Sequence, residues 1–455
     1  MPSESLQRRE PVEPLLLSPI EGMFWHLEEH FGGAFRVVVV LRLDGCIEAD
    51  SLATALRHLQ RRHPKLRAVI AQGSDGRLRY EFEDSAPPPI PFEIMDYKEE
   101  DLPWREGVRQ LLQTDWQAGP LAAVTVLRSR PRGCSELLLT AHHAIADGMS
   151  AIMLMDDLLT EYAKAEANPD APPPPVLPAV VAKRAKPSGG WLSRLWLLQR
   201  FVRNQREERR SRQTSLPETR GIPPQSQWVH WVLSTDDTTR LVRRCRKEQV
   251  SLAGALAAAA YSGLMDCLPV SQALFKCQFP FNLREVLEGS AGPVTAQDLG
   301  CFASIMNQFC EVHQPPTFWN LARHEHQSLQ VFVKHGGPSF NYNMAAVAAT
   351  RLFERASPIL TASSNKRVTL LVANYGVINI RNEYGSLRPR ECTLTFKNDL
   401  TGPSLLIEAL VLGQRLNIGF AADSLEPAFW DRLQMAVRRR LEAASAAIET
   451  ASIEA

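Results

Sequence analysis

A run of four consecutive prolines at 172–175 divides this chain of 455 residues into two halves. The run lies within the segment 168–190, where the prolines favour an extended, semi-rigid backbone. The halves on either side share a similar mixture of strand and helix patterns, although no repeat is visible in the sequence. We therefore expect an N-terminal subdomain at 1–167, a proline-rich linker and basic amphipathic segment at 168–226, and a C-terminal subdomain at 227–455.

Both halves contain patterns of buried strands and helices. Residues 36–43 form a continuous, β-branched apolar run that is typical of a buried strand, and residues 48–62 carry leucines on one helical face. Residues 273–281 predict another strand in the second half. The alanine-rich stretch 252–270 contains Asp266 and a serine, so it predicts a buried core helix rather than a membrane span. Together these patterns predict an α/β fold.

The residues 142–148 read HHAIADG and lie between a predicted strand and a predicted helix. The leucines at 137–139 precede the two histidines, and apolar residues recur at helical spacing after Gly148. Histidine is the side chain best suited to move a proton near neutral pH. The helix start would also supply free N–H groups and a positive dipole end close to the imidazole. The alternative is a buried histidine pair that satisfies local hydrogen bonds and has no chemistry.

Other kinds of chemistry lack their sequence signals. We find no phosphate loop, no GxGxxG after a strand and no GxSxG elbow. The eight cysteines form no CxxC pair, and no histidine cluster completes a zinc pattern, which predicts a reducing compartment and no bound metal. His324-Glu325-His326 is the other close histidine pair, and its polar surroundings predict a solvated face. One general base without a covalent nucleophile favours direct attack by a bound acceptor on a bound activated donor.

Charge and terminal composition bear on partners and location. The net charge of +1 gives no support for nucleic-acid binding. The first fourteen residues contain no apolar stretch, so we expect no leader and a cytoplasmic protein. The segment 191–212 mixes apolar and aromatic residues with many arginines. We expect a helix packed on the body with a solvated arginine face, and the alternative is contact with a membrane surface or an acidic partner.

Several stretches, in order along the chain, resemble the condensation-domain and CoA-dependent acyltransferase superfamily, whose signature is HHxxxDG. Besides 142–148, the matching stretches are LSPIE at 17–21, HPKLR at 63–67, FNLR at 281–284, LGCF at 299–302 and ANYG at 373–376. This resemblance covers most of the chain. It implies two chloramphenicol-acetyltransferase-like αβ sandwich subdomains, with the signature in an active-site channel at their interface.

The resemblance also implies a role for each residue of the signature. His143 would be the general base that takes a proton from a hydroxyl or amine as it attacks a thioester. His142 would be structural. Gly148 would let the backbone turn closely, leave room for a pantetheine arm and offer its N–H to an oxyanion.

Two residues outside the signature complete this expected site. Arg284 would form an ion pair with Asp147, which would point away from the channel and fix the loop. Losing one partner of such a buried pair costs roughly 3–5 kcal/mol. Asn374 would help to position the substrate.

The resemblance favours a free-standing acyltransferase that is similar to those associated with polyketide synthases. The residues 373–377 differ from the DFGWG loop of peptide-forming members, and the chain carries no adenylation or carrier segment. The expected donor is a CoA thioester or an acyl carrier protein thioester, the expected acceptor is a small alcohol or amine, and no cofactor is expected. The alternatives are a wax-ester synthase or diacylglycerol-type acyltransferase, which would suit membrane contact by 191–212, and a stand-alone nonribosomal-peptide-type condensation enzyme. An inactive recruitment platform is the non-enzyme alternative, although such platforms typically lose the second histidine or the aspartate, and both are present here.

Overall fold

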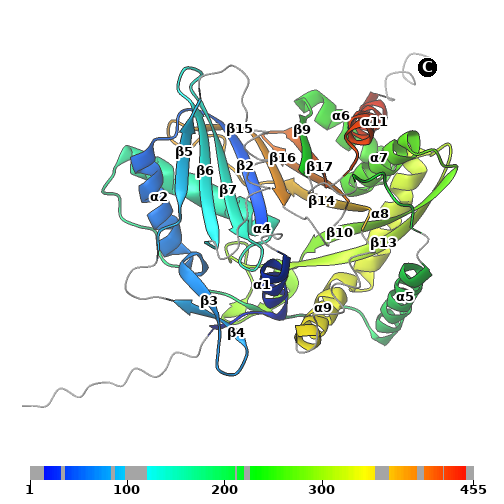
Figure 1. Cartoon of the computed structure of the whole chain (residues 1–455), viewed down its shortest axis with the longest axis horizontal. Coiled ribbons are helices and arrows are strands. Elements are labelled where there is room, and N and C mark those ends of the chain that lie inside the picture. Colours follow the sequence, from blue (N-terminus) through cyan, green and yellow to red (C-terminus); the bar gives the residue numbers. More distant parts are fainter. Residues whose placement is uncertain are drawn as a thin grey trace, which may run out of the picture.

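The computed structural model describes residues 15–31, 36–82, 88–97, 120–210, 213–219, 226–353, 368–396, 404–423 and 425–446. The first fourteen residues, which contain no apolar stretch, lie outside this part, as do Ser211 and Arg212 at the end of the basic segment. Two large sheets stand side by side, one built mainly from the N-terminal half and one from the C-terminal half (Figure 1).

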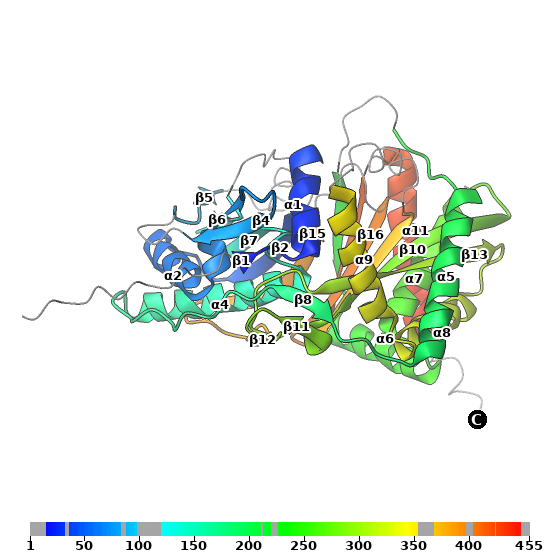
Figure 2. The same ribbon diagram turned by 90° about the horizontal axis from the view of Figure 1, so that it is seen from below.

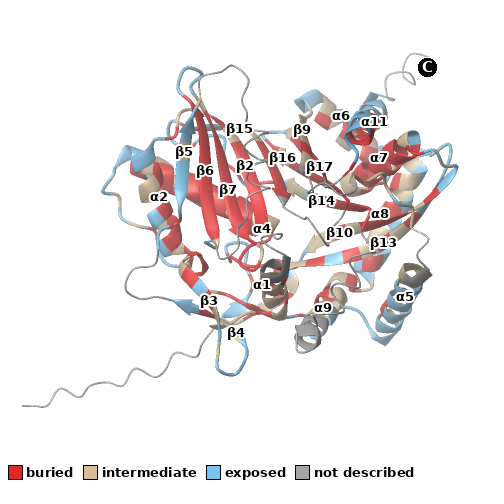
Figure 3. Cartoon of the chain, in the orientation of Figure 1, coloured by how far each residue is buried: buried red, intermediate tan, exposed pale blue. Residues whose placement is uncertain are grey.

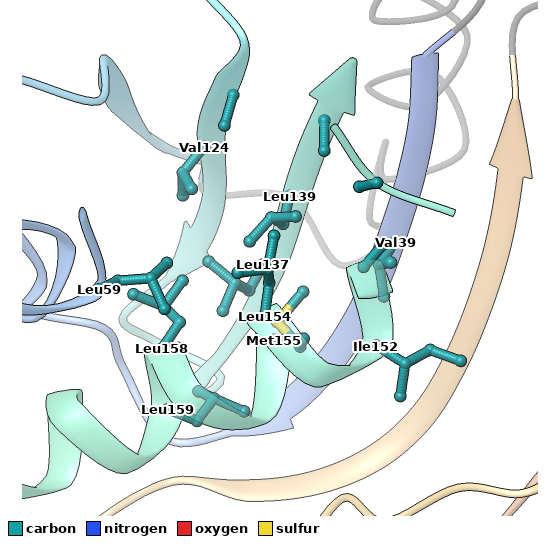
Figure 4. Packing of buried hydrophobic residues seen from close by; sticks show 14 of the residues in the cluster. Val39, Leu59, Val124, Leu137, Leu139, Ile152, Leu154, Met155, Leu158 and Leu159 are labelled. Carbon is teal, nitrogen blue, oxygen red and sulfur yellow. The ribbon is translucent and has the colours of Figure 1, made fainter. Parts of the chain in front are cut away.

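The first sheet has five strands in the order β15-β2-β7-β6-β5. In that order the strands are β15 (Arg388–Phe396), β2 (Arg36–Asp44), β7 (Cys134–His142), β6 (Ala122–Ser129) and β5 (Phe92–Asp96). Helices α2 (Ala49–Arg62) and α4 (Gly148–Ala167) pack against each other and cover one face of this sheet. Figure 4 shows leucine, valine and methionine side chains of the helices and strands pointing toward one another in that layer.

The β-branched run of β2 is buried on both faces, and this explains why its sequence does not alternate with polar residues. Val39 and Leu41 belong to the core under α4. Val38 and Val40 belong to a second cluster that includes Trp228 of the other sheet. Successive strand residues point to opposite faces, so one continuous apolar run packs against two layers.

The second sheet has six strands in the order β13-β10-β14-β16-β17-β9. They are β13 (Ala303–His313), β10 (Gln272–Asn282), β14 (Leu370–Val377), β16 (Leu405–Leu412), β17 (Arg415–Asp423) and β9 (Ser226–Val232). The helices beside it are α6 (Thr235–Lys247), α7 (Leu252–Cys267), α8 (Phe318–Lys334) and α11 (Pro427–Ala446). The predicted core helix at 252–270 is confirmed, because α7 packs between α8 and α11 and most of its residues are buried.

Smaller elements complete the fold. One three-stranded sheet contains β1 (Leu15–Leu16), β4 (Leu78–Phe82) and β3 (Ala68–Gln72), and another contains β12 (Gly292–Pro293), β11 (Leu287–Gly289) and β8 (Ala182–Ala185). The 3-10 turns are Pro64–Arg67 and Arg284–Val286. The helices α1 (Pro19–Phe31), α9 (Gly337–Phe353) and α5 (Trp191–Arg210) lie along one side of the molecule (Figure 2).

The division into two sheets does not follow the expected segment boundaries throughout. β15 comes from the expected C-terminal segment at 227–455, yet it pairs along β2 in the first sheet. The proline-rich segment is bound to the body, because β8 pairs with β11 and Val180 and Val181 are buried. Within the described residues no single helix is long and apolar enough to cross a membrane, and α6 and α7 meet that test only as a pair bent by 98°.

Candidate active site

The HHAIADG residues form a tight connection between the end of β7 and the start of α4. β7 ends at His142 and α4 begins at Gly148. Asp147 is the N-cap of α4, and its Oδ1 accepts a hydrogen bond from the N–H of Ser150 at 2.7 Å. The N–H of Ala144 donates to Nδ1 of His142 at 2.9 Å. Backbone and side chain together fix the loop that carries His143.

His142 lies inside the protein rather than in a cavity wall. Its side chain is buried, and its ring lies 5.3 Å from that of Trp25 between centroids. The hydrogen bond from Ala144 closes the turn right behind it. The position of His142 is therefore compatible with the structural role that the resemblance implies.

Asp147 and Arg284 form the expected ion pair. The guanidinium donates from Nη2 to Oδ1 at 2.9 Å and from Nη1 to Oδ2 at 3.0 Å. The N–H of Phe302 donates to Oδ2 at 2.9 Å, so each carboxylate oxygen has two donors. Burial alone would raise the pKa of Asp147, but the charge of Arg284 and these hydrogen bonds outweigh it and lower the pKa. Asp147 is therefore held as a carboxylate in the interior.

This network ties together stretches that are far apart in sequence. The N–H of Asp147 donates to the carbonyl of Gly300 at 3.1 Å, and the hydroxyl of Ser150 donates to the same carbonyl at 2.8 Å. Arg284 also donates to the hydroxyl of Ser150 at 2.7 Å. The segments at 281–284 and 299–302 thus hold the loop from the C-terminal half, across the interface between the halves.

Two other stretches named by the resemblance also meet. Lys65 donates to Oε1 of Glu21 at 2.6 Å, and both side chains are only 1% exposed. At the start of α1 the N–H of Ser18 donates to Oε2 of Glu21 at 2.8 Å and the N–H of Glu21 donates to Oγ of Ser18 at 3.2 Å, as in a capping box. This buried pair joins α1, which carries Phe24, to the 3-10 turn after α2.

His143 is half-buried and borders a cavity of about 720 Å³. Its ring stacks on Phe24, with centroids 4.1 Å apart and planes 6° apart. Sγ of Cys301 lies 3.7 Å from Nδ1 of the imidazole. Burial, with the nearby carboxylates of Asp147 and Glu21, raises the pKa of Cys301, so this cysteine stays a neutral thiol and is unsuited to act as a nucleophile.

The cavity lies between the two halves and its wall is mostly apolar. Residues of α1, β10, β13, β14, β16, α5 and α9 line it together with the loop at 143–149. The apolar part of the lining includes Met23, Leu27, Val37, Leu197, Phe281, Ile305, Phe332, Met344 and Leu371. A wall of this kind suits an apolar chain with a few polar groups at its reactive end.

Gly148 is required by a close approach of Tyr375. A Cβ atom at position 148 would lie 2.5 Å from Cε1 of the tyrosine ring, which is far inside normal contact. The hydroxyl of Tyr375 donates to Oε1 of Glu408 at 2.9 Å, and this bond holds the ring in place. The expected room for a pantetheine arm beside Gly148 is thus filled by the phenol ring, and the steric need for glycine arises from that ring.

Glu408 is a cavity residue that the sequence did not point to. It borders the cavity from β16 and is only 4% exposed. Burial raises the pKa of Glu408 to about 8, although the hydrogen bond from Tyr375 acts in the opposite direction. Within the part of the chain that the structure describes, its Oε2 atom has no hydrogen-bond partner. A single glutamate in the otherwise apolar strand LLIEALVL is the signal that could have revealed it.

Asn374 borders the cavity, as the resemblance of residues 373–376 implies. Its Oδ1 accepts a hydrogen bond from the N–H of Gly376 at 3.1 Å, which forms a local turn. The residue is exposed. A role in positioning substrate stays a prediction for this residue.

The stretch His324-Glu325-His326 does not form a solvated face, so that prediction was wrong for its central residue. Glu325 is fully buried, and burial raises its pKa to about 7. Tyr261 donates to Oε1 of Glu325 at 3.3 Å. Potential ligand atoms of Cys310, His324 and Glu325 lie within 4.8 Å of one another. None of these three residues lines the cavity that His143 borders.

Comparison with known proteins relates the chain to one family. The family model for the Condensation domain matches residues 14–279, more than half of the chain. The chain is 29% identical to chondramide synthase cmdD of Chondromyces crocatus over 168 residues, which are 35% of this chain and 4% of that protein. It is 28% identical to phosphinothricin tripeptide synthetase PhsC of Streptomyces viridochromogenes over 183 residues, 38% of this chain and 17% of that protein. The chain therefore spans a small part of these curated relatives.

Solved structures share its fold over nearly the whole length. Polyketide synthase associated protein 5 from Mycobacterium tuberculosis is 20% identical with a TM-score of 0.65, covering 95% of this chain and 98% of that one. TRI3 trichothecene 15-O-acetyltransferase from Fusarium sporotrichioides is 12% identical with a TM-score of 0.72, covering 94% and 95%. The first condensation domain of the CDA synthetase is 14% identical with a TM-score of 0.65, covering 96% and 97%. These likenesses confirm the expected α/β fold with two chloramphenicol-acetyltransferase-like subdomains.

Proposed function

The chain belongs to the condensation-domain family, and on this basis we propose that it is an acyltransferase that uses His143 as its general base. The observation that carries the proposal is the placement of His143 in the wall of an apolar cavity between the two halves. The loop behind it is fixed by the Asp147–Arg284 ion pair. The base is therefore presented on a rigid support, as acid–base catalysis requires.

The proposed reaction is direct transfer from a thioester to an acceptor. As the acceptor oxygen or nitrogen attacks the thioester carbonyl carbon, Nε2 of His143, the ring nitrogen away from Cys301, takes the acceptor's proton. The tetrahedral intermediate then collapses, the carbon–sulfur bond breaks, and the thiol leaves with the proton returned by His143. The N–H of Gly148, at the start of α4, is our proposed donor to the oxyanion.

The proposed donor is a CoA or acyl carrier protein thioester, and the proposed acceptor is a small alcohol. An O-acyl product is favoured by the likeness, over nearly the whole length, to an enzyme named as an O-acetyltransferase. Amide formation is a second candidate, because the curated relatives include peptide synthetases. An amine acceptor would react through the same base and the same intermediate.

A screen of donors against acceptors tests this function. Purified protein is incubated with acyl-CoA thioesters of two to sixteen carbons, or with the same acyl groups on a carrier protein, and with a panel of alcohols and amines. Liquid chromatography with mass detection follows the ester or amide, and a thiol reagent follows the released thiol. We expect product and free thiol in equal amounts for at least one pair. Binding of carrier protein without transfer from any donor would contradict the proposal and favour a recruitment platform.

A further inference from the structure

The helix α5 carries an unusual number of exposed apolar side chains. Trp191, Leu195, Leu198 and Val202 are spaced by four, three and four residues, so they share one face of the helix, and we call them the apolar stripe. Their exposed fractions are 74%, 47%, 50% and 40%. Figure 3 shows α5 largely pale blue at the periphery of the molecule. We expected a helix packed on the body with a solvated arginine face. The helix is packed and most of its described arginines are exposed, but apolar residues also form much of its outer face.

The opposite face of α5 is firmly anchored, so the stripe is held out by the fold. Leu197 is buried against the cluster that contains Phe332. Arg200 is also buried and donates to the carbonyl of Asn307 at 3.1 Å and to Oε1 of Gln308 at 2.8 Å. Burial, with the nearby Arg203, lowers the pKa of Arg200 to about 10. This arginine is therefore part of the anchor, and the stripe cannot turn inward without breaking these contacts.

Positive charge surrounds the apolar stripe. Arg194, Arg203 and Arg206 are exposed and flank it at helical spacing. The acidic residue Glu208 is engaged elsewhere, since Lys276 donates to its Oε1 at 2.6 Å. An apolar face with tryptophan and leucine between exposed arginines is the pattern of a helix that lies in the interface of an anionic membrane.

The helix that carries the apolar stripe also borders the cavity, through residues beside the stripe. Phe201 is 42% exposed and also lines the cavity, together with Leu197 and Asn204 from the anchored side of α5. A lipid surface in contact with the stripe would therefore lie beside a wall of the cavity.

We propose that α5 docks the protein on an anionic lipid surface through the apolar stripe and its flanking arginines. The proposal concerns binding and does not depend on acyl transfer. The partner is a membrane surface, and contact with another protein is the outcome that the following experiments would reveal instead.

Vesicle co-sedimentation tests the proposal with the full chain. Wild-type protein is mixed with vesicles of phosphatidylcholine alone or with one-third phosphatidylglycerol. We expect binding to the anionic vesicles that weakens at high salt. The variant Leu195→Glu/Leu198→Glu should bind at least about tenfold more weakly, because it places two charges in the lipid-facing stripe. The matched control is Met435→Glu, an exposed apolar residue on α11, which should bind like the wild type.

Fluorescence provides a second readout that locates the contact. Trp191 should shift to shorter wavelength on anionic vesicles, and Trp191→Phe should lose this shift while still sedimenting with the vesicles. Thermal melts by circular dichroism establish that all variants fold. Wild-type protein that stays in the supernatant with anionic vesicles, or a folded Leu195→Glu/Leu198→Glu variant that binds like the wild type, would overturn the proposal and point to a protein partner.

Discussion

Two buried carboxyl groups border the same cavity in opposite electrostatic surroundings. Asp147 accepts hydrogen bonds from Arg284 and from two backbone N–H groups, and its pKa is lowered. Glu408 accepts one hydrogen bond, from Tyr375, and burial raises its pKa to about 8. The difference shows that burial alone does not set the charge of a group, because the number and charge of its partners decide. Asp147 belongs to the scaffold, whereas Glu408 keeps one buried carboxyl oxygen without a hydrogen-bond partner among the described residues.

The largest effect is expected from Asp147→Asn. This change leaves Arg284 buried without a carboxylate, so the free energy of unfolding should fall by roughly 3–5 kcal/mol. Urea unfolding followed by circular dichroism measures it. The matched control is Glu442→Gln, which breaks the exposed pair with Arg438 and should cost less than about 1 kcal/mol. If both variants lowered the free energy of unfolding by the same amount, the proposed structural role of Asp147 would be wrong.

The next largest effect is expected in the pH dependence of stability, through Glu408→Gln. The folded-state pKa of about 8 lies above the ordinary value of 4.5, so the folded protein keeps a proton that the unfolded chain loses. This contribution is fully present below pH 4.5 and is lost as pH rises through 8. Between pH 5 and 8 the wild type should lose roughly 2–4 kcal/mol that the variant keeps.

Urea unfolding of both proteins at pH 5 and pH 8 measures this difference. Burial also raises the pKa of Glu136 and of Glu325 to about 7, so both proteins should keep a common slope from these groups. Parallel stability curves for wild type and Glu408→Gln would show that Glu408 is not held protonated.

A smaller effect is expected at Gly148, where the loop that carries Asp147 meets Tyr375, the hydrogen-bond partner of Glu408. Gly148→Ala brings a methyl group against the ring of Tyr375, which should cost about 1–3 kcal/mol of stability. In a Tyr375→Ala background the same change should cost much less, because the ring is gone. A double-mutant cycle from thermal or urea unfolding measures the coupling. Additive losses would mean that the ring does not determine the need for glycine.

The sequence predicted the parts of this site that depend on local patterns. The strand before the two histidines, the helix after Gly148 and the buried strand at 36–43 all follow from apolar spacing. The partner of Asp147 was reached through the resemblance at 281–284, because nothing local to the loop names Arg284. Local patterns succeed here because each of these elements buries a face that its own residues define.

The other parts depend on long-range packing, which spacing does not encode. Tyr375 and Glu408 meet because β14 and β16 pair in parallel, with residues 373 and 408 in register. β15 crosses into the first sheet, although its sequence resembles any amphipathic strand. The outward face of α5 likewise depends on the contacts that bury Arg200.

The most direct test of the account is the rate of acyl transfer by His143→Ala, measured with a donor and acceptor identified by the screen. His143 lies in the cavity wall outside the ion-pair network, so the variant should unfold like the wild type while its transfer rate falls by about 10²–10⁴-fold. The matched control is His313→Ala, whose side chain is 66% exposed and which should keep the full rate. A folded His143→Ala variant that transfers acyl groups at the wild-type rate would contradict the account.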